Sequence, residues 1–115
     1  MRSPKSKAMK RLDESDHRRQ VGERLVLARE AVGKRQVDWA REYGLPTHSK
    51  LANWEAGTHY PSPWFLAQVC EDYGFTMDWF YRGVRAGVSA ARADDLRRAM
   101  TEKPEASPAR ADLET

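Results

Sequence analysis

The chain has 115 residues, enough for one domain with tails, and its hydrophobic content of 40% allows a modest core. A formal net charge of +3 permits nucleic-acid binding but does not require it. The lone cysteine, Cys70, cannot form an internal disulfide, the three histidines lack metal-ligand spacing, and no apolar run is long enough to cross a bilayer. We therefore expect a cytoplasmic protein without membrane contact, metal or cofactor.

Five short helices are expected between residues 18 and 83, each with an apolar stripe and a glycine at its end. Thr47 or Ser49 is expected to cap the third helix, and Thr76 to cap the fifth. Pro63 suits the first turn of the fourth. The expected helices cover residues 18–32, 36–43, 47–56, 63–73 and 76–83.

Two tails flank this helical region. Residues 1–17 are polar and basic, and we expect a flexible arm; residues 84–115 form a C-terminal extension. Within the extension, Ser89 can cap a helix over about residues 89–100, but its few apolar residues require a partner surface. The rest is rich in Pro, Ala and acid and is expected to be disordered. The predicted class is all-α, a five-helix domain over residues 18–83 with an N-terminal arm and a C-terminal extension.

The second and third expected helices are joined by a short turn that contains Gly44. Their apolar residues, Trp39 on one and Leu51 and Trp54 on the other, meet at one junction. In a helix-turn-helix, the second helix of such a pair enters the major groove of DNA. All-α domains also form such pairs for packing alone, so this spacing by itself leaves both interpretations open.

A series of motifs distinguishes between the DNA-binding and the packing interpretation of this helix pair. Four of them follow one another between Val21 and Gly83: VGERLVLAREAVG, QVDWAREYGL, KLANWEAG and PSPWFLAQVCEDYGFTMDWFYRG. This series resembles the Cro/repressor family of helix-turn-helix proteins, often called XRE-type, with Ala40 and Gly44 where that family needs small residues. The resemblance implies a five-helix, repressor-like DNA-binding domain over residues 18–83 that reads DNA with its third helix.

The resemblance also implies which side chains contact DNA. Asparagine can pair with adenine, histidine and serine can donate to purine edges, and lysine can reach guanine or a phosphate. From the residues alone, capping by His48 and Ser49 and a solvated Asn53 are the preferred interpretation. The implied base-reading residues are His48, Ser49, Lys50, Ala52 and Asn53. The implied phosphate contacts are Gln36, Arg35, Lys34, Arg29, Thr58, His59 and Tyr60.

Other residues are expected to support this surface. Arg29 and Glu55 match positions that form an ion pair beside the DNA backbone in this family; an ordinary exposed charge pair is the alternative. Packing support is expected from Glu55, Trp39, Leu51, Trp54 and Gly44.

The chain departs from the family pattern in three places. The LPTHSK segment is one residue longer than usual, Arg35 stands where a Ser or Thr cap is common, and residues 58–60 replace basic residues. Phosphate affinity is then expected to depend on other cations, and the basic arm is either a further DNA contact or a solvated tail. These cations are Arg18, Arg19, Lys34, Arg35 and Lys50.

The aromatic residues divide into core and surface. Trp39 and Trp54 are expected in the core, whereas one of Trp64 and Phe65 is expected at the surface. An exposed aromatic would suit a dimer interface. The candidate interface residues are Trp64, Phe80 and Tyr81.

The leading hypothesis is a sequence-specific transcriptional regulator. It would be a dimeric repressor that acts on a phage, prophage or mobile-element promoter, which can be the promoter of its own gene. It would bind a pseudo-palindromic operator in double-stranded DNA. The alternative is an antitoxin-like interaction module that neutralises a protein partner through its tail and represses its own operon. We do not expect an enzyme, since the sequence lacks a nucleophile–base pair, a phosphate-cradling glycine loop and a metal set.

Overall fold

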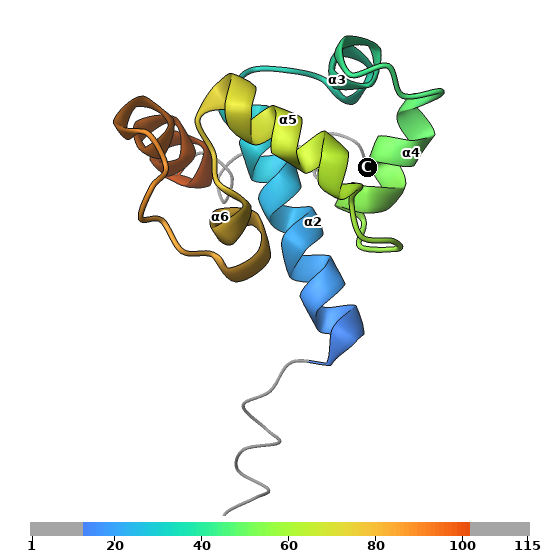
Figure 1. Cartoon of the computed structure of the whole chain (residues 1–115), viewed down its shortest axis with the longest axis horizontal. Helices are drawn as coiled ribbons and strands as arrows, with labels where there is room; N and C mark the ends of the chain where they lie inside the picture. The colour runs from blue at the N-terminus through green and yellow to red at the C-terminus, as the bar shows by residue number, and fades with distance from the viewer. Residues whose placement is uncertain (1–12, 102–115) are drawn as a thin grey trace, which may run out of the picture.

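The computed structural model describes residues 13–101, and every regular element in that range is a helix, which confirms the predicted all-α class (Figure 1). The parts of the expected arm and disordered tail at residues 1–12 and 102–115 lie outside the described residues. The helices are α2 (Glu14–Ala31), α3 (Gln36–Glu42), α4 (His48–Glu55), α5 (Pro63–Tyr73), α6 (Met77–Arg82) and a C-terminal helix that covers residues 90–101.

The first of these, α2, begins at Glu14, before the expected start at Arg18. The prediction that the arm extends to residue 17 was therefore wrong. Asp13 is the N-cap, and its carboxylate accepts a hydrogen bond from the Asp16 amide at 2.9 Å. Acidic residues in the first turn also suit the positive end of the helix dipole. The apolar stripe starts only at Val21, so hydrophobic periodicity places the start of the helix too late.

The N-cap residues of α4, α5 and α6 differ in whether they form a cap hydrogen bond. The Ser62 hydroxyl accepts from the Phe65 amide at 3.3 Å at the start of α5. As expected, Thr76 caps α6, with its hydroxyl accepting from the Trp79 amide at 3.0 Å. Thr47 occupies the N-cap position of α4 but forms no side-chain cap hydrogen bond. The start of α4 therefore lacks the side-chain cap hydrogen bond that α2, α5 and α6 have.

An aromatic cluster joins α5 to the pair α3 and α4. Phe65 of α5 is fully buried, and its ring centroid lies 5.9 Å from that of Trp39, 5.3 Å from that of Tyr43 and 5.0 Å from that of Trp54. Trp39 and Trp54 are 0% and 5% exposed, which confirms their predicted place in the core. Because Phe65 touches both helices, it holds them at a fixed angle.

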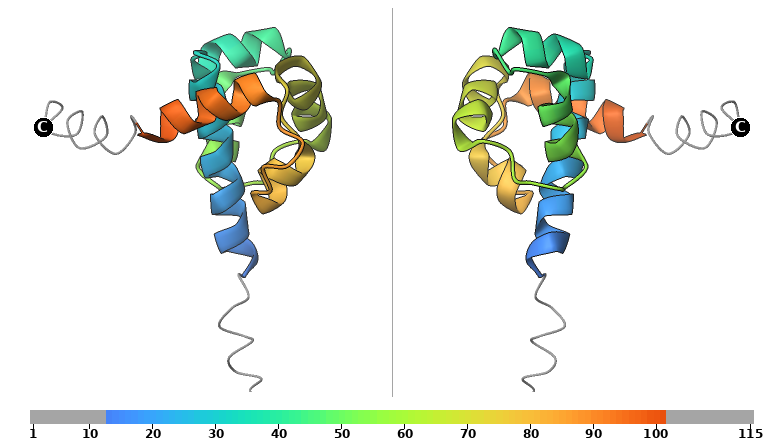
Figure 2. Two further views of the ribbon diagram at one scale, coloured as in Figure 1. Left: turned by 90° about the vertical axis from the view of Figure 1, so that its left-hand side faces the viewer. Right: turned by 90° about the vertical axis from the view of Figure 1, so that its right-hand side faces the viewer.

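The C-terminal helix packs on the same core. Leu96 is 1% exposed and belongs to the core cluster, so the packed unit extends past the boundary expected at Gly83. At the helix start, the Ser89 amide donates to the Gly74 carbonyl, and Arg92 Nε donates to the Tyr73 carbonyl at 2.6 Å. Figures 1 and 2 show this helix and α4 on opposite sides of α2. Within residues 13–101, the helices are too short or too polar to cross a membrane.

Candidate nucleic-acid interface

The pair α3 and α4 is joined by a tight turn. Gly44 adopts φ 69°, a left-handed conformation that glycine reaches without steric cost. The Leu45 amide then donates to the Ala40 carbonyl at 2.8 Å, which closes the end of α3. Ala40 is 4% exposed, so its small side chain fits between the helices. The residues expected to support the pair therefore do so through packing and turn geometry.

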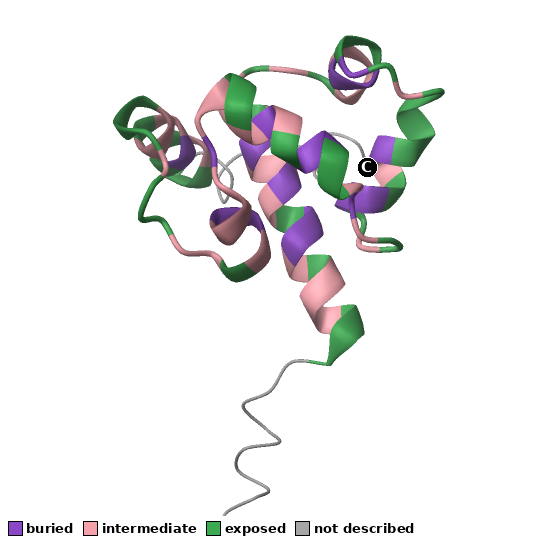
Figure 3. Ribbon diagram, in the orientation of Figure 1, coloured by how far each residue is buried: buried purple, intermediate pink, exposed green. Residues whose placement is uncertain are grey.

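The two sides of α4 differ in burial (Figure 3). Leu51, Trp54 and Glu55 are buried against the rest of the domain. Of the predicted base-reading residues, Ala52 is half-buried and the others are exposed: His48, Ser49, Lys50 and Asn53. On an α-helix, Ser49 and Asn53 are four residues apart and lie on one side, opposite Leu51. The outward side of α4 is thus polar and free for contact.

A buried carboxylate fixes α4 to two other helices. The Glu55 side chain is 5% exposed and forms a two-pronged ion pair with Arg29 of α2, at 2.7 Å from Nε and 3.0 Å from Nη2. Gln36, at the start of α3, donates from Nε2 to Glu55 Oε1 at 2.8 Å. Arg29 Nη1 also donates to the Lys34 carbonyl at 3.0 Å. Planar, two-pronged pairs of this kind restrict orientation as well as adding energy.

Two predicted phosphate contacts are changed by this arrangement. The Gln36 side-chain amide, expected to reach a phosphate, is bonded to Glu55; the alternative contact through the Gln36 backbone amide is unaffected. Arg29 is 14% exposed, so most of its guanidinium is engaged inside the protein. Both residues position α4 in this structure.

The cations before α3 are paired with acids. Lys34 Nζ lies 3.6 Å from Glu42, and Arg35 binds Asp38 through Nε and Nη2, both at 3.0 Å. Asp38 also accepts from the Arg35 backbone amide, which is the N3 half of a capping box, so the first turn of α3 is held without a Ser or Thr at the N-cap. The hydrogen bonds from Arg35 lower the pKa of Asp38 to about 2. Any contact of Lys34 or Arg35 with DNA would therefore also bring a carboxylate close to the phosphates.

The three residues after α4 that were predicted to contact phosphates, Thr58, His59 and Tyr60, differ in exposure. Thr58 and His59 are exposed, as a phosphate contact requires. Tyr60 is half-buried, and its hydroxyl lies 2.6 Å from Nδ1 of His17 on α2. The other ring nitrogen of His17, Nε2, donates to the Tyr81 carbonyl at 2.7 Å. The hydroxyl that was expected to reach a phosphate is thus used inside the domain.

The three aromatics predicted for a dimer interface have different surroundings. Trp64 is 63% exposed on the first turn of α5, and Tyr81 is half-buried at the end of α6. Phe80 is fully buried and packs against Phe75 and Trp79, so its assignment to an interface was wrong. In a helix of six residues, the side that faces the core takes up Trp79 and Phe80 together.

Sequence reasoning missed two residues that shape this surface. His17 ties α2 to both Tyr60 and Tyr81, and no pattern in the sequence marks it. Gly22 lies inside α2, where an added Cβ would come within 2.5 Å of the Glu55 carbonyl oxygen. A glycine inside a helix is unfavourable, so its presence there could have indicated the close approach of α4.

A sequence model of a helix-turn-helix domain family matches residues 20–79, more than half of the chain and the whole of α3, α4 and α5. No curated protein and no solved structure matched the chain. The matched range contains the α3–α4 pair, its turn and the Glu55 contacts described above. The chain therefore belongs to the helix-turn-helix domain family.

Proposed function

We propose that this protein is a sequence-specific DNA-binding transcriptional regulator that reads bases with the outward side of α4. One observation carries the proposal: α4 presents exposed, mostly uncharged hydrogen-bonding side chains while its inward side is fixed by the buried Glu55. Direct readout needs donors and acceptors held at a defined angle in the major groove. The buried, two-pronged pair of Glu55 with Arg29 fixes the angle of α4 in this way.

The proposal assigns roles to the residues of this surface. Asn53 pairs with adenine, and His48 and Ser49 donate to purine edges. Lys50 stands beside them and reaches guanine or a phosphate, and Ala52 lets the helix approach the base edges closely. Backbone phosphates are bound by Thr58, His59 and the amides at the start of α3.

The finer form of the proposal is a dimeric repressor of the Cro/repressor type, acting on a mobile-element promoter or on its own. The residue proposed for the contact between two copies is Trp64, which is 63% exposed, because aromatic side chains are enriched at protein interfaces. Two copies would bind half-sites one helical turn apart. Light scattering of the purified protein, with and without Trp64→Glu, tests the dimer: the wild type is expected at twice the mass of the variant.

DNA binding is tested with two duplexes at about 150 mM salt, where purely electrostatic binding is weakened. One duplex carries the sequence upstream of the protein's own gene, and the other is its scrambled version. We expect tight binding to the first alone, and its loss in the double variant His48→Ala, Asn53→Ala. Equal, weak binding to both duplexes that the variant retains would contradict autoregulation through α4.

A further inference from the structure

One side of α2 lies against the end of α4, with an arginine on each side of the crossing point. Arg18 and Arg29 are eleven residues apart, about three helical turns, so they lie on the same side of α2. Gly22 lies between them, at the place where a Cβ would meet the Glu55 carbonyl. Arg29 binds the Glu55 carboxylate, and Arg18 Nε donates to the carbonyl of Gly57, just past α4, at 3.2 Å.

The Arg18 guanidinium is held in place by its neighbours. Its Cζ lies 5.9 Å from the centroid of the Tyr60 ring, in a cation–π contact. Tyr60 is itself fixed by the hydrogen bond to His17 at 2.6 Å. The acidic neighbour of Arg18 is Glu14, 3.9 Å away and 74% exposed. Arg18 is thus oriented by neutral groups, and its charge is only weakly compensated.

We propose that Arg18 binds a backbone phosphate beside the C-terminal end of α4, in place of the contact expected from Tyr60. This inference rests on the proposed function. Lys34 and Arg35 have carboxylate partners at 3.6 Å and 3.0 Å, whereas the Glu14 carboxylate lies 3.9 Å from Arg18 and is 74% exposed, so the Arg18 charge is the least compensated of the three. A guanidinium that is already oriented loses little conformational freedom when it binds a phosphate.

A phosphate bound by Arg18 differs from any phosphate beside the Arg29–Glu55 pair. At about 1.5 Å of rise per residue, their positions on α2 are roughly 16 Å apart, whereas charges follow one another every ~3.4 Å along one DNA strand. The Arg18 contact therefore adds separately to the salt dependence of binding. It also supplies a cation beside Thr58 and His59, where the segment after α4 lacks basic residues.

The test uses the full chain and a short labelled duplex of random sequence, because a phosphate contact does not depend on sequence. Binding is measured between 50 and 200 mM salt for the wild type and Arg18→Gln. Each phosphate contact contributes about 0.9 to the slope of log affinity against log salt. Over this fourfold change in salt, the wild type is expected to lose about 3.5-fold more affinity than Arg18→Gln. Arg18→Lys should restore the wild-type slope.

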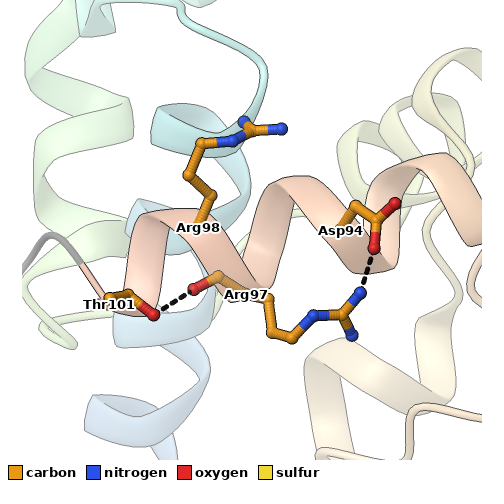
Figure 4. A pocket seen from close by; sticks show the side chains of 4 residues that line it. All are labelled: Asp94, Arg97, Arg98 and Thr101. Carbon is orange, nitrogen blue, oxygen red and sulfur yellow. Dashed lines mark hydrogen bonds and ion pairs between the residues drawn. The ribbon is translucent and has the colours of Figure 1, made fainter.

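The matched control is Arg97→Gln, which removes the same charge from the C-terminal helix, on the side of α2 away from α4 (Figures 1 and 2). Arg97 pairs with Asp94 at a shallow depression lined by Asp94, Arg97, Arg98 and Thr101 (Figure 4). The slope of log affinity against log salt for Arg97→Gln is expected to equal that of the wild type.

Three results distinguish the possible roles of Arg18. A slope for Arg18→Gln equal to those of the wild type and Arg97→Gln overturns the inference and leaves the proposed function intact. The same slope with a lowered Tm would mean that Arg18 serves only to bind the Gly57 carbonyl. A wild type that binds no duplex even at 50 mM salt overturns the proposed function together with the inference.

Discussion

Replacing Gly22 with alanine is expected to push α2 away from α4. The added Cβ would lie 2.5 Å from the Glu55 carbonyl oxygen and 2.7 Å from that of Trp54. Both contacts are backbone atoms of a packed helix, so neither can turn aside as the end of a flexible side chain would. The two helices must therefore separate, and the Arg29–Glu55 pair across the same contact is stretched.

The size of the effect follows from two opposing terms. Alanine is favoured over glycine inside a helix by about 1 kcal/mol. Overpacking at a rigid contact costs about 3 kcal/mol. The net loss of unfolding free energy is about 2 kcal/mol, which lowers Tm by roughly 8–16 °C in a domain of this size. Thermal and urea unfolding followed by circular dichroism measure both quantities.

Gly44→Ala is the matched comparison. Gly44 has φ 69° and open space around its Cα, so alanine there brings strain without a clash. We expect a loss of about 1 kcal/mol at this site. The reasoning is refuted if Gly22→Ala raises Tm, as a glycine-to-alanine change does on an exposed helix surface.

Three further predictions concern other parts of the fold. Glu55→Ala leaves the guanidinium of Arg29 buried and unpaired and should cost about 3 kcal/mol in urea unfolding; a loss under about 0.5 kcal/mol would mean a pair of the ordinary surface type. Leu96→Ala should cost about 2–4 kcal/mol, since Leu96 joins the core, and an unchanged Tm would mean that the C-terminal helix is detached. Burial and the hydrogen bond to Asp72 raise the pKa of Tyr43 above its usual 10. The folded phenol thus keeps its proton where the unfolded one loses it, so this contribution to stability is present below pH 10 and declines above it. Tm should therefore fall more steeply above pH 10 in the wild type than in Tyr43→Phe, and parallel curves would contradict this assignment.

The helices were predictable because their signals are local. The Thr76 cap, Pro63 in the first turn of α5 and the glycines that follow the helices act within one turn of the chain, and the apolar stripes have helical spacing. The start of α2 was missed because Asp13 caps two turns of polar residues that carry no apolar pattern.

The site was only partly predictable, since its contacts join residues that are far apart in sequence. The resemblance placed Arg29 opposite Glu55, and the structure contains that pair. It could not show that Gln36 joins the same carboxylate or that His17 takes the Tyr60 hydroxyl. Those partners depend on how the helices pack, and Gly22 permits the close approach of α2 to α4. Phe80 was misplaced because a six-residue helix gives too few positions for its inward side to be identified.

The most direct test of base reading by α4 takes the duplex that the protein selects from a random-sequence pool. Affinity is measured for that duplex and for each single base-pair substitution of it, with the wild type and Asn53→Ala. We predict that Asn53→Ala abolishes discrimination at one A·T position per half-site, worth about 1–3 kcal/mol, and leaves the other positions unchanged. A uniform loss of affinity across all duplexes, or no change at any position, would contradict readout by this helix.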